Sequence, residues 1–225
     1  RDREKLLNDL EGILKHDHQR KNRGTTIATE LSFGLPDSKF PPLERILPSG
    51  RAVNFRGSID RVERTETGSL IVIDYKTGKI GDYQNLSSDN PTLGGSQLQL
   101  PLYALAANTY LGEEPETGHA LYWFTSDSER WATHGYAIDP DILEKFDEAI
   151  EVIVDGIEGG LFPSKPTPSN SRWTGVGECR FCNPDELGSG GSTEKWEALS
   201  ELGLFSPYAM LRGNGDSVDQ EVSNE

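Results

Sequence analysis

Cysteine is scarce in this chain, and so are long apolar runs. Its only two cysteines, Cys179 and Cys182, cannot build the disulfide scaffold of a small secreted domain. No apolar run approaches the ~20 residues of a membrane span, and the charged start RDREKLLNDL is unlike a secretory signal. We therefore expect a cytoplasmic protein with no membrane partner. Because this start has no initiator Met, we also expect the chain to be part of a longer protein.

Basic residues are outnumbered, with 22 Lys+Arg against 37 Asp+Glu and a formal net charge of −15. Contacts to nucleic-acid phosphates normally come from Lys and Arg, so we expect this chain to bind nucleic acid weakly by itself. Acidity of this kind also serves solubility, and it does not exclude a nucleic-acid substrate. A partner chain could supply the missing basic surface.

The hydrophobic pattern predicts alternating helices and strands. An α/β core with a central mixed β-sheet flanked by α-helices fits their order. Helices are expected at 3–18, 96–111 (with Ser96 as N-cap), 139–159 and about 193–202. Strands are expected at 25–33, 51–64, 69–78, 119–127 and 130–138. The proline-rich stretch 36–42 and the Gly/Ser/Asn-rich stretch 79–96 are expected to be loops, and the second could border a substrate.

One predicted hairpin carries most of the chemistry, with GSID at 57–60 on one strand and VIDYKTGK at 72–79 on the next. Residues i and i+2 share a strand face, so Asp74 and Lys76 point the same way, and Asp60 arrives from the paired strand. Two carboxylates suit a hard divalent cation, and an adjacent lysine can orient and activate water for phosphodiester hydrolysis. Asp74 also interrupts the apolar run LIVID, where an unpaired carboxylate is costly.

The next helix adds Gln99 and Tyr103, which lie four residues apart on one helix face. Packing of the helix on the sheet is an alternative role for Tyr103, and Gln97 is an alternative to Gln99.

The ordered motifs GSIDR, IDYKTG, QLQLPLY and CRFC resemble the PD-(D/E)XK nuclease superfamily, and within it the RecB-like nuclease domains. The resemblance covers residues 26–185 and implies a restriction-endonuclease-like fold for a core at 25–187. An N-terminal helix and loop (1–24) and a C-terminal helix with an acidic, disordered tail (188–225) flank this core. The resemblance implies Asp60, Asp74 and the carbonyl of Tyr75 as ligands of Mg²⁺ or Mn²⁺, and Lys76, Gln99 and Tyr103 as further catalytic residues.

The resemblance further implies an exonuclease in DNA recombination and repair that acts on single strands or duplex ends, beside a helicase domain or subunit. RecB-like domains tend to carry an acidic residue on the first strand, which would be Glu30, and an upstream histidine, for which His16 and His18 are the candidates. A complete [4Fe–4S] cluster needs four thiolates and cannot form from Cys179 and Cys182 alone.

Two other functions remain open. The same fold could bind nucleic acid or a protein partner without cleaving, as an inactive PD-(D/E)XK module. Alternatively, the site could hydrolyse small phosphoesters, which a narrow pocket would favour over an open channel.

Overall fold

The computed structural model describes residues 2–111, 118–162, 196, 198–199, 202–203 and 205–216. The chain divides into two compact units, one of residues 1–151 with 214–225 and the other of residues 152–213. None of the described helices is both long and apolar enough to span a membrane. Cys179 and Cys182, the connector around them and most of the helix expected at 193–202 lie outside the described residues.

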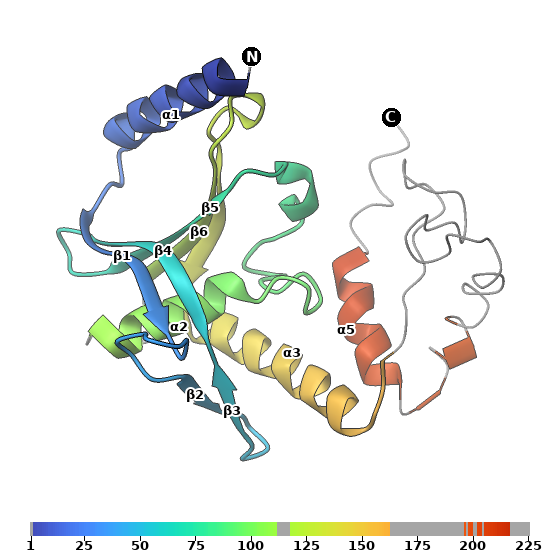
Figure 1. Cartoon of the computed structure of the whole chain (residues 1–225). Coiled ribbons are helices and arrows are strands. Elements are labelled where there is room, and N and C mark those ends of the chain that lie inside the picture. Colours follow the sequence, from blue (N-terminus) through green and yellow to red (C-terminus); the bar gives the residue numbers. More distant parts are fainter. Residues whose placement is uncertain are drawn as a thin grey trace. The chain divides into compact units, whose positions relative to one another are not determined.

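The central sheet has five strands in the order β1-β4-β5-β6-β7. Strands β5 and β6 pair in parallel and the other neighbours pair antiparallel, so the predicted mixed sheet is confirmed. Figure 1 shows the sheet with its helices. The five strands are β1 (Thr25–Phe33), β4 (Gly57–Arg64), β5 (Leu70–Lys76), β6 (Gly118–Phe124) and β7 (Thr133–Ile138).

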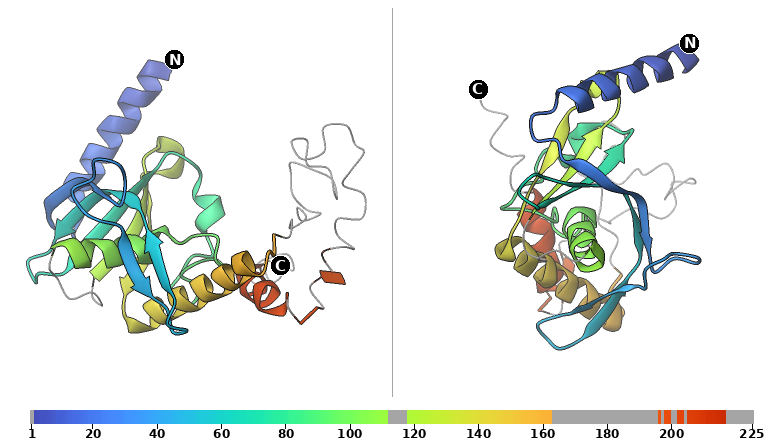
Figure 2. Two further views of the ribbon diagram at one scale, coloured as in Figure 1. Left: turned by 60° about the horizontal axis from the view of Figure 1, so that its bottom comes forward. Right: turned by 90° about the vertical axis from the view of Figure 1, so that its left-hand side faces the viewer.

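Helices cover both faces of this sheet (Figure 2). Helix α1 (Asp2–Gln19) places Ile13 against Ile71, Ile73 and Trp123 on one face. Helix α2 (Gln99–Leu111) lies on the opposite face, and nine consecutive residues of it, Leu100 to Asn108, are buried. A helix that is buried all round is a core helix, which explains its uniformly apolar sequence.

Helix α3 (Pro140–Glu158) follows β7 and begins as the sequence predicted. The side chain of Asp139 caps it by accepting the backbone N–H of Ile142 at 2.9 Å, and proline is well suited to the first helical position. Two short 3₁₀ turns, Ile80–Tyr83 and Asp127–Glu129, lie in the connections after β5 and β6.

The segment 51–64 is not one strand, as we expected, but two. Strand β3 (Ala52–Phe55) pairs with β2 (Leu43–Ile46) in a separate two-stranded sheet, whereas β4 joins the central sheet after a break at Arg56. Just after this break the backbone passes close to β1 and α2. A Cβ atom at Gly57 would lie 3.0 Å from the Tyr103 ring and 3.1 Å from Phe33. Strand β2 was not predicted, because prolines precede it.

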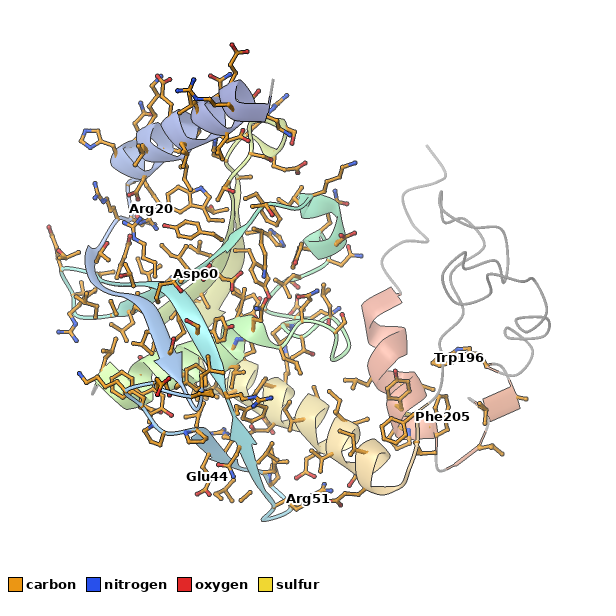
Figure 3. The ribbon with its side chains drawn as sticks, viewed as in Figure 1. Arg20, Glu44, Arg51, Asp60, Trp196 and Phe205 are labelled. Atoms are coloured by element: carbon orange, nitrogen blue, oxygen red, sulfur yellow. The ribbon has the colours of Figure 1, made fainter. Side chains whose placement is uncertain are left out.

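Two helix predictions also need correction. Helix α2 begins at Gln99, so Ser96 is not its N-cap; the Ser96 hydroxyl instead donates to the carbonyl of Leu93 at 2.8 Å within the preceding loop. Helix α5 (Ser206–Asp216) was not expected, and it includes residues 213–216, which we had assigned to the tail. In its unit, Trp196 packs edge-on against Phe205, with ring centroids 5.3 Å apart (Figure 3).

Candidate active site

The candidate site lies where β4 and β5 stop pairing with each other. Their register ends at Arg61 opposite Ile73, and the next residue on each strand is an aspartate, Asp60 and Asp74. The backbone N–H of Tyr75 no longer bonds β4 but donates to Asp60 Oδ2 at 2.7 Å. The carboxylate of Asp60, on an interior strand of the sheet (Figure 3), therefore holds the opening between the two strands.

Asp74 is buried, with 5% of its surface exposed, and it faces α2. Its Oδ2 lies 2.7 Å from Lys76 Nζ in an ion pair but makes no hydrogen bond of good geometry. Burial raises the pKa of Asp74, and the nearby charge of Asp60 raises it further, while the hydrogen bond and charge of Lys76 act in the opposite direction. Asp74 is thus a carboxylate whose ionised form is incompletely stabilised by protein groups.

Gln99, at the first turn of α2, connects the members of the site. Its Oε1 accepts from Lys76 Nζ at 2.8 Å, and its Nε2 lies 3.5 Å from both Asp74 Oδ1 and the Tyr103 hydroxyl. The structure therefore brings Asp74, Lys76, Gln99 and Tyr103 into one polar network, as their spacing predicted. Tyr103 also packs edge-on against Phe33, so it has a packing contact as well.

Sequence reasoning missed Tyr122 on β6. The parallel register of β5 and β6 sets Tyr122 directly beside Asp74. Its ring is fully buried and lies under Lys76 Nζ, with 4.7 Å between the ammonium nitrogen and the ring centroid. Gln97, which we had weighed as an alternative to Gln99, contacts the Tyr122 hydroxyl at 3.3 Å. Only the pairing of β5 with β6 could have revealed this residue.

The accessory candidates are not drawn into the network. Glu30 is exposed and has a positive φ of 49°. His16 and His18 are exposed on α1, where His16 stacks on Trp131 with ring centroids 5.0 Å apart. Among the described residues, no three or more His, Cys, Asp or Glu side chains form a group that could hold a metal ion.

A divalent cation nonetheless fits what the two aspartates offer. The unsatisfied Asp74 Oδ2 is a hard oxygen donor, and Asp60 contributes a second negative charge that already acts on Asp74. Mg²⁺ and Mn²⁺ sites often use only one or two carboxylates and complete their coordination with water and substrate phosphate. Two aspartates are therefore sufficient protein ligands for such an ion.

The opposite face of the same strands is braced by an ion-pair cluster. The fully buried Glu63 accepts from Arg20 Nη2 at 2.6 Å and from the Gly24 backbone N–H at 3.0 Å, and it pairs with Arg61 at 2.5 Å. Arg61 also donates to the Tyr75 hydroxyl at 3.2 Å and to Asp17 of α1 at 3.0 Å. These bonds anchor α1 and its following loop to the strands that carry Asp60 and Asp74.

The loop at 79–96 is tied down by side chains of the elements that follow it. The ring Nε2 of His134 lies 2.8 Å from the Leu86 carbonyl, the Tyr136 hydroxyl donates to Pro91 at 2.6 Å, and Lys145 donates to Ser88 at 2.9 Å. This loop ends next to Gln97 and Gln99, so its attachment to β7 and α3 helps to fix the start of α2.

An α/β core with a mixed sheet, and an Asp60…Asp74-x-Lys76 set at the point where two strands separate, define a nuclease-type fold and site. The model of the PD-(D/E)XK nuclease superfamily matches residues 1–186, and the chain belongs to this superfamily.

Two of its relatives are proteins named as one of the subunits of an ATP-dependent helicase/deoxyribonuclease. The one from Moorella thermoacetica is 33% identical over 130 residues, which is 54% of this chain and 11% of that protein. The one from Clostridium tetani is 46% identical over 79 residues, which is 34% of this chain and 6% of that protein. The matched region is thus a small part of each relative. A solved structure, "Crystal structure of SSO0001", aligns with 66% of this chain and 59% of that one at 19% identity, with a TM-score of 0.35.

Proposed function

We propose that this chain is a metal-dependent deoxyribonuclease domain that hydrolyses phosphodiester bonds, acting as an exonuclease beside a helicase domain or subunit. The observation that carries the proposal is the contact of Lys76 with Asp74 at 2.7 Å, with Asp60 held next to them by the Tyr75 N–H. The superfamily match and the names of the two relatives support a nuclease-type function.

In this proposal Asp60 and Asp74 hold Mg²⁺ or Mn²⁺, with the Tyr75 carbonyl as a third oxygen. The ion supplies an activated water and neutralises charge on the scissile phosphate. Lys76 stabilises the negative charge that develops in the transition state, because its ammonium group is fixed before the reaction begins. Gln99 orients Lys76 through the 2.8 Å hydrogen bond and reaches toward Asp74 with its amide nitrogen.

The charge of the chain is compatible with a DNA substrate when its distribution is considered. Residues 1–80 contain 15 Lys+Arg and 12 Asp+Glu, whereas residues 81–225 contain 7 and 25. The excess of acidic residues therefore lies entirely in the second part, and the strands that carry Asp60, Asp74 and Lys76 belong to a mildly basic part. We expect binding of DNA through this part, with a marked dependence on salt concentration.

The test is cleavage of end-labelled single-stranded and double-stranded DNA with Mg²⁺, Mn²⁺ or EDTA. Wild type should cut only with a divalent metal, and Lys76→Ala should reduce the rate by roughly 10²–10³-fold, as loss of a charge-stabilising group does. Lys15→Ala is the matched control, because Lys15 is an exposed lysine of α1 paired only with Glu11. Shortening from one end would support the exonuclease mode.

The same experiment addresses the inactive-module alternative. A folded wild-type protein that binds DNA but cuts neither substrate with either metal would replace the nuclease proposal with that of a binding module. Cleavage of a small phosphodiester but of no DNA would instead favour a small-phosphoester hydrolase.

A further inference from the structure

Tyr122 occupies a position that packing alone does not explain. It is fully buried in the middle of the sheet, yet its hydroxyl lies 3.3 Å from Gln97 Oε1 and 3.5 Å from Gln99 Oε1. Phe124, two residues along the same strand, is equally buried without a hydroxyl. A buried hydroxyl needs a hydrogen-bond partner, and here both partners are side chains at the start of α2.

The hydroxyl of Tyr122 acts as a donor at neutral pH. Burial, and secondly the negative charge of Asp74, raise the pKa of Tyr122 well above its ordinary value, so the phenol keeps its proton. It therefore reinforces Lys76 in directing the carbonyl oxygen of Gln99 toward the ammonium group. The amide nitrogen of Gln99 is then left on the side of Asp74 and Tyr103.

Lys76 has three contacts in this structure, and one of them conflicts with cation binding. Its Nζ lies 2.7 Å from Asp74 Oδ2, 2.8 Å from Gln99 Oε1 and 4.7 Å from the centroid of the Tyr122 ring. If Asp74 is a metal ligand, its charge is shared and its hold on Lys76 weakens. The two remaining contacts, the ring face and the Gln99 carbonyl oxygen, compete with no metal, because neither group is a carboxylate.

We propose that Tyr122 is a positioning residue that keeps the ammonium group of Lys76 in the site when Asp74 is occupied by a divalent cation. Its ring face attracts the ammonium directly, and its hydroxyl holds the Gln99 oxygen on which Lys76 rests. The inference rests on the proposed function for its metal and its reaction. It goes beyond that function by assigning a role to a residue on β6, a strand outside the Asp-x-Lys hairpin.

Two substitutions separate the ring from the hydroxyl. Tyr122→Phe keeps the ring face, and Tyr122→Leu removes both groups. At saturating Mg²⁺ we expect the single-turnover cleavage rate of Tyr122→Phe to stay within about threefold of wild type, and that of Tyr122→Leu to fall at least about tenfold with little change in KM for DNA. Phe146→Leu is the control, since Phe146 is an equally buried aromatic residue on α3 that packs against Phe55. A general loss of packing would slow Phe146→Leu as well.

A second measurement needs no cleavage. Lysines are reductively methylated with ¹³C, which keeps their positive charge, and the methyl signal of Lys76 is assigned as the one missing in Lys76→Arg. A group over an aromatic face resonates upfield, so we expect the Lys76 signal to be upfield in wild type and Tyr122→Phe but not in Tyr122→Leu. It should remain upfield when Mg²⁺ is titrated to saturation, with saturation established by calorimetry.

The outcomes distinguish this inference from the proposed function. A Lys76 signal that leaves the upfield region on Mg²⁺ saturation, or a Tyr122→Leu variant that cleaves as fast as Phe146→Leu, overturns the role of Tyr122 and leaves the nuclease assignment intact. Absence of any heat of Mg²⁺ or Mn²⁺ binding overturns both, because Asp74 is then never occupied. An upfield signal retained with bound Mg²⁺, together with the ring-dependent rate, supports the inference.

Discussion

Asp60 Oδ2 accepts the backbone N–H of Tyr75 at 2.7 Å, across the opening where β4 and β5 cease to pair. One carboxylate thus replaces a ladder hydrogen bond of the sheet and leaves its other oxygen for a further ligand. The strand that carries Asp74 and Lys76 is fixed by the side chain of the other proposed metal ligand. Structure and function therefore depend on the same residue here, and substitution can separate the two roles.

We predict that Asp60→Asn and Asp60→Ala differ in stability but not in cleavage. Asparagine retains an oxygen acceptor for the Tyr75 N–H, whereas alanine leaves that N–H unpaired in a half-buried position at a cost of roughly 1–3 kcal/mol. Both variants lose the negative charge and should lose divalent-metal binding and cleavage. Denaturant unfolding and metal titration by calorimetry measure the two effects. Equal stabilities of the two variants would contradict the structural role of the Asp60–Tyr75 bond.

The buried pair of Asp74 and Lys76 predicts a stability defect that a second substitution corrects. Lys76→Met should destabilise the metal-free protein by up to about 3 kcal/mol, because it leaves Asp74 buried without its counter-charge. Adding Asp74→Asn to Lys76→Met should restore most of that stability, since the buried charge is then gone. Thermal unfolding of the two variants in EDTA tests the prediction. Saturating Mg²⁺ should stabilise Lys76→Met but not the double variant.

The pH dependence of metal binding follows from the raised pKa of Asp74. A metal competes with the proton for this carboxylate, so affinity should fall as the pH is lowered through the pKa of Asp74. Because burial raises that pKa, the loss should begin at a higher pH than for an ordinary exposed aspartate. Without metal, the sign for folding is also set: ionised Asp74 lowers stability, and this penalty disappears as the pH falls through the same pKa.

Calorimetric titrations with Mn²⁺ over a series of pH values measure this dependence. An affinity that stays constant until the pH approaches the ordinary aspartate value near 3.8 would show that Asp74 is not perturbed as the structure implies. The folding effect is checked separately in EDTA by comparing the thermal unfolding of wild type with that of the Lys76→Met/Asp74→Asn variant, whose pH dependence should lack the contribution of Asp74.

The sequence was sufficient to predict the local part of the site. Residues two apart on a strand or four apart on a helix share a face whatever the rest of the fold does, so the relations of Asp74 to Lys76 and of Gln99 to Tyr103 follow from spacing. The mixed sheet followed from the order of the elements. The roles of these residues in catalysis remain predictions.

The non-local part of the site could not be predicted. Tyr122 lies beside Asp74 because β5 and β6 pair in parallel across a long connection that contains α2, and no periodicity encodes the register of such a pair. The break at Arg56 was hidden for a similar reason, because β3 and β4 are both strands and differ only in the sheet they join. Both features depend on tertiary pairing and not on local propensity.

The back of the site gives a last prediction, on Glu63. This fully buried carboxylate pairs with Arg20 and Arg61 and accepts the Gly24 N–H, and Arg61 in turn bonds Tyr75 and Asp17. Glu63→Leu should destabilise the protein by about 3–5 kcal/mol, because two guanidinium groups lose their buried partner.

The same substitution should also weaken metal binding at Asp60 and Asp74, since Arg61 is the link between α1 and the strand that carries them. The matched control is Glu11→Ala, which breaks an exposed pair with Lys15 on the same helix α1 and should change neither stability nor metal affinity. Urea unfolding and Mn²⁺ titration of both variants provide the comparison. If Glu63→Leu were destabilised but bound Mn²⁺ with wild-type affinity, the cluster would serve the attachment of α1 alone and would not position the metal ligands.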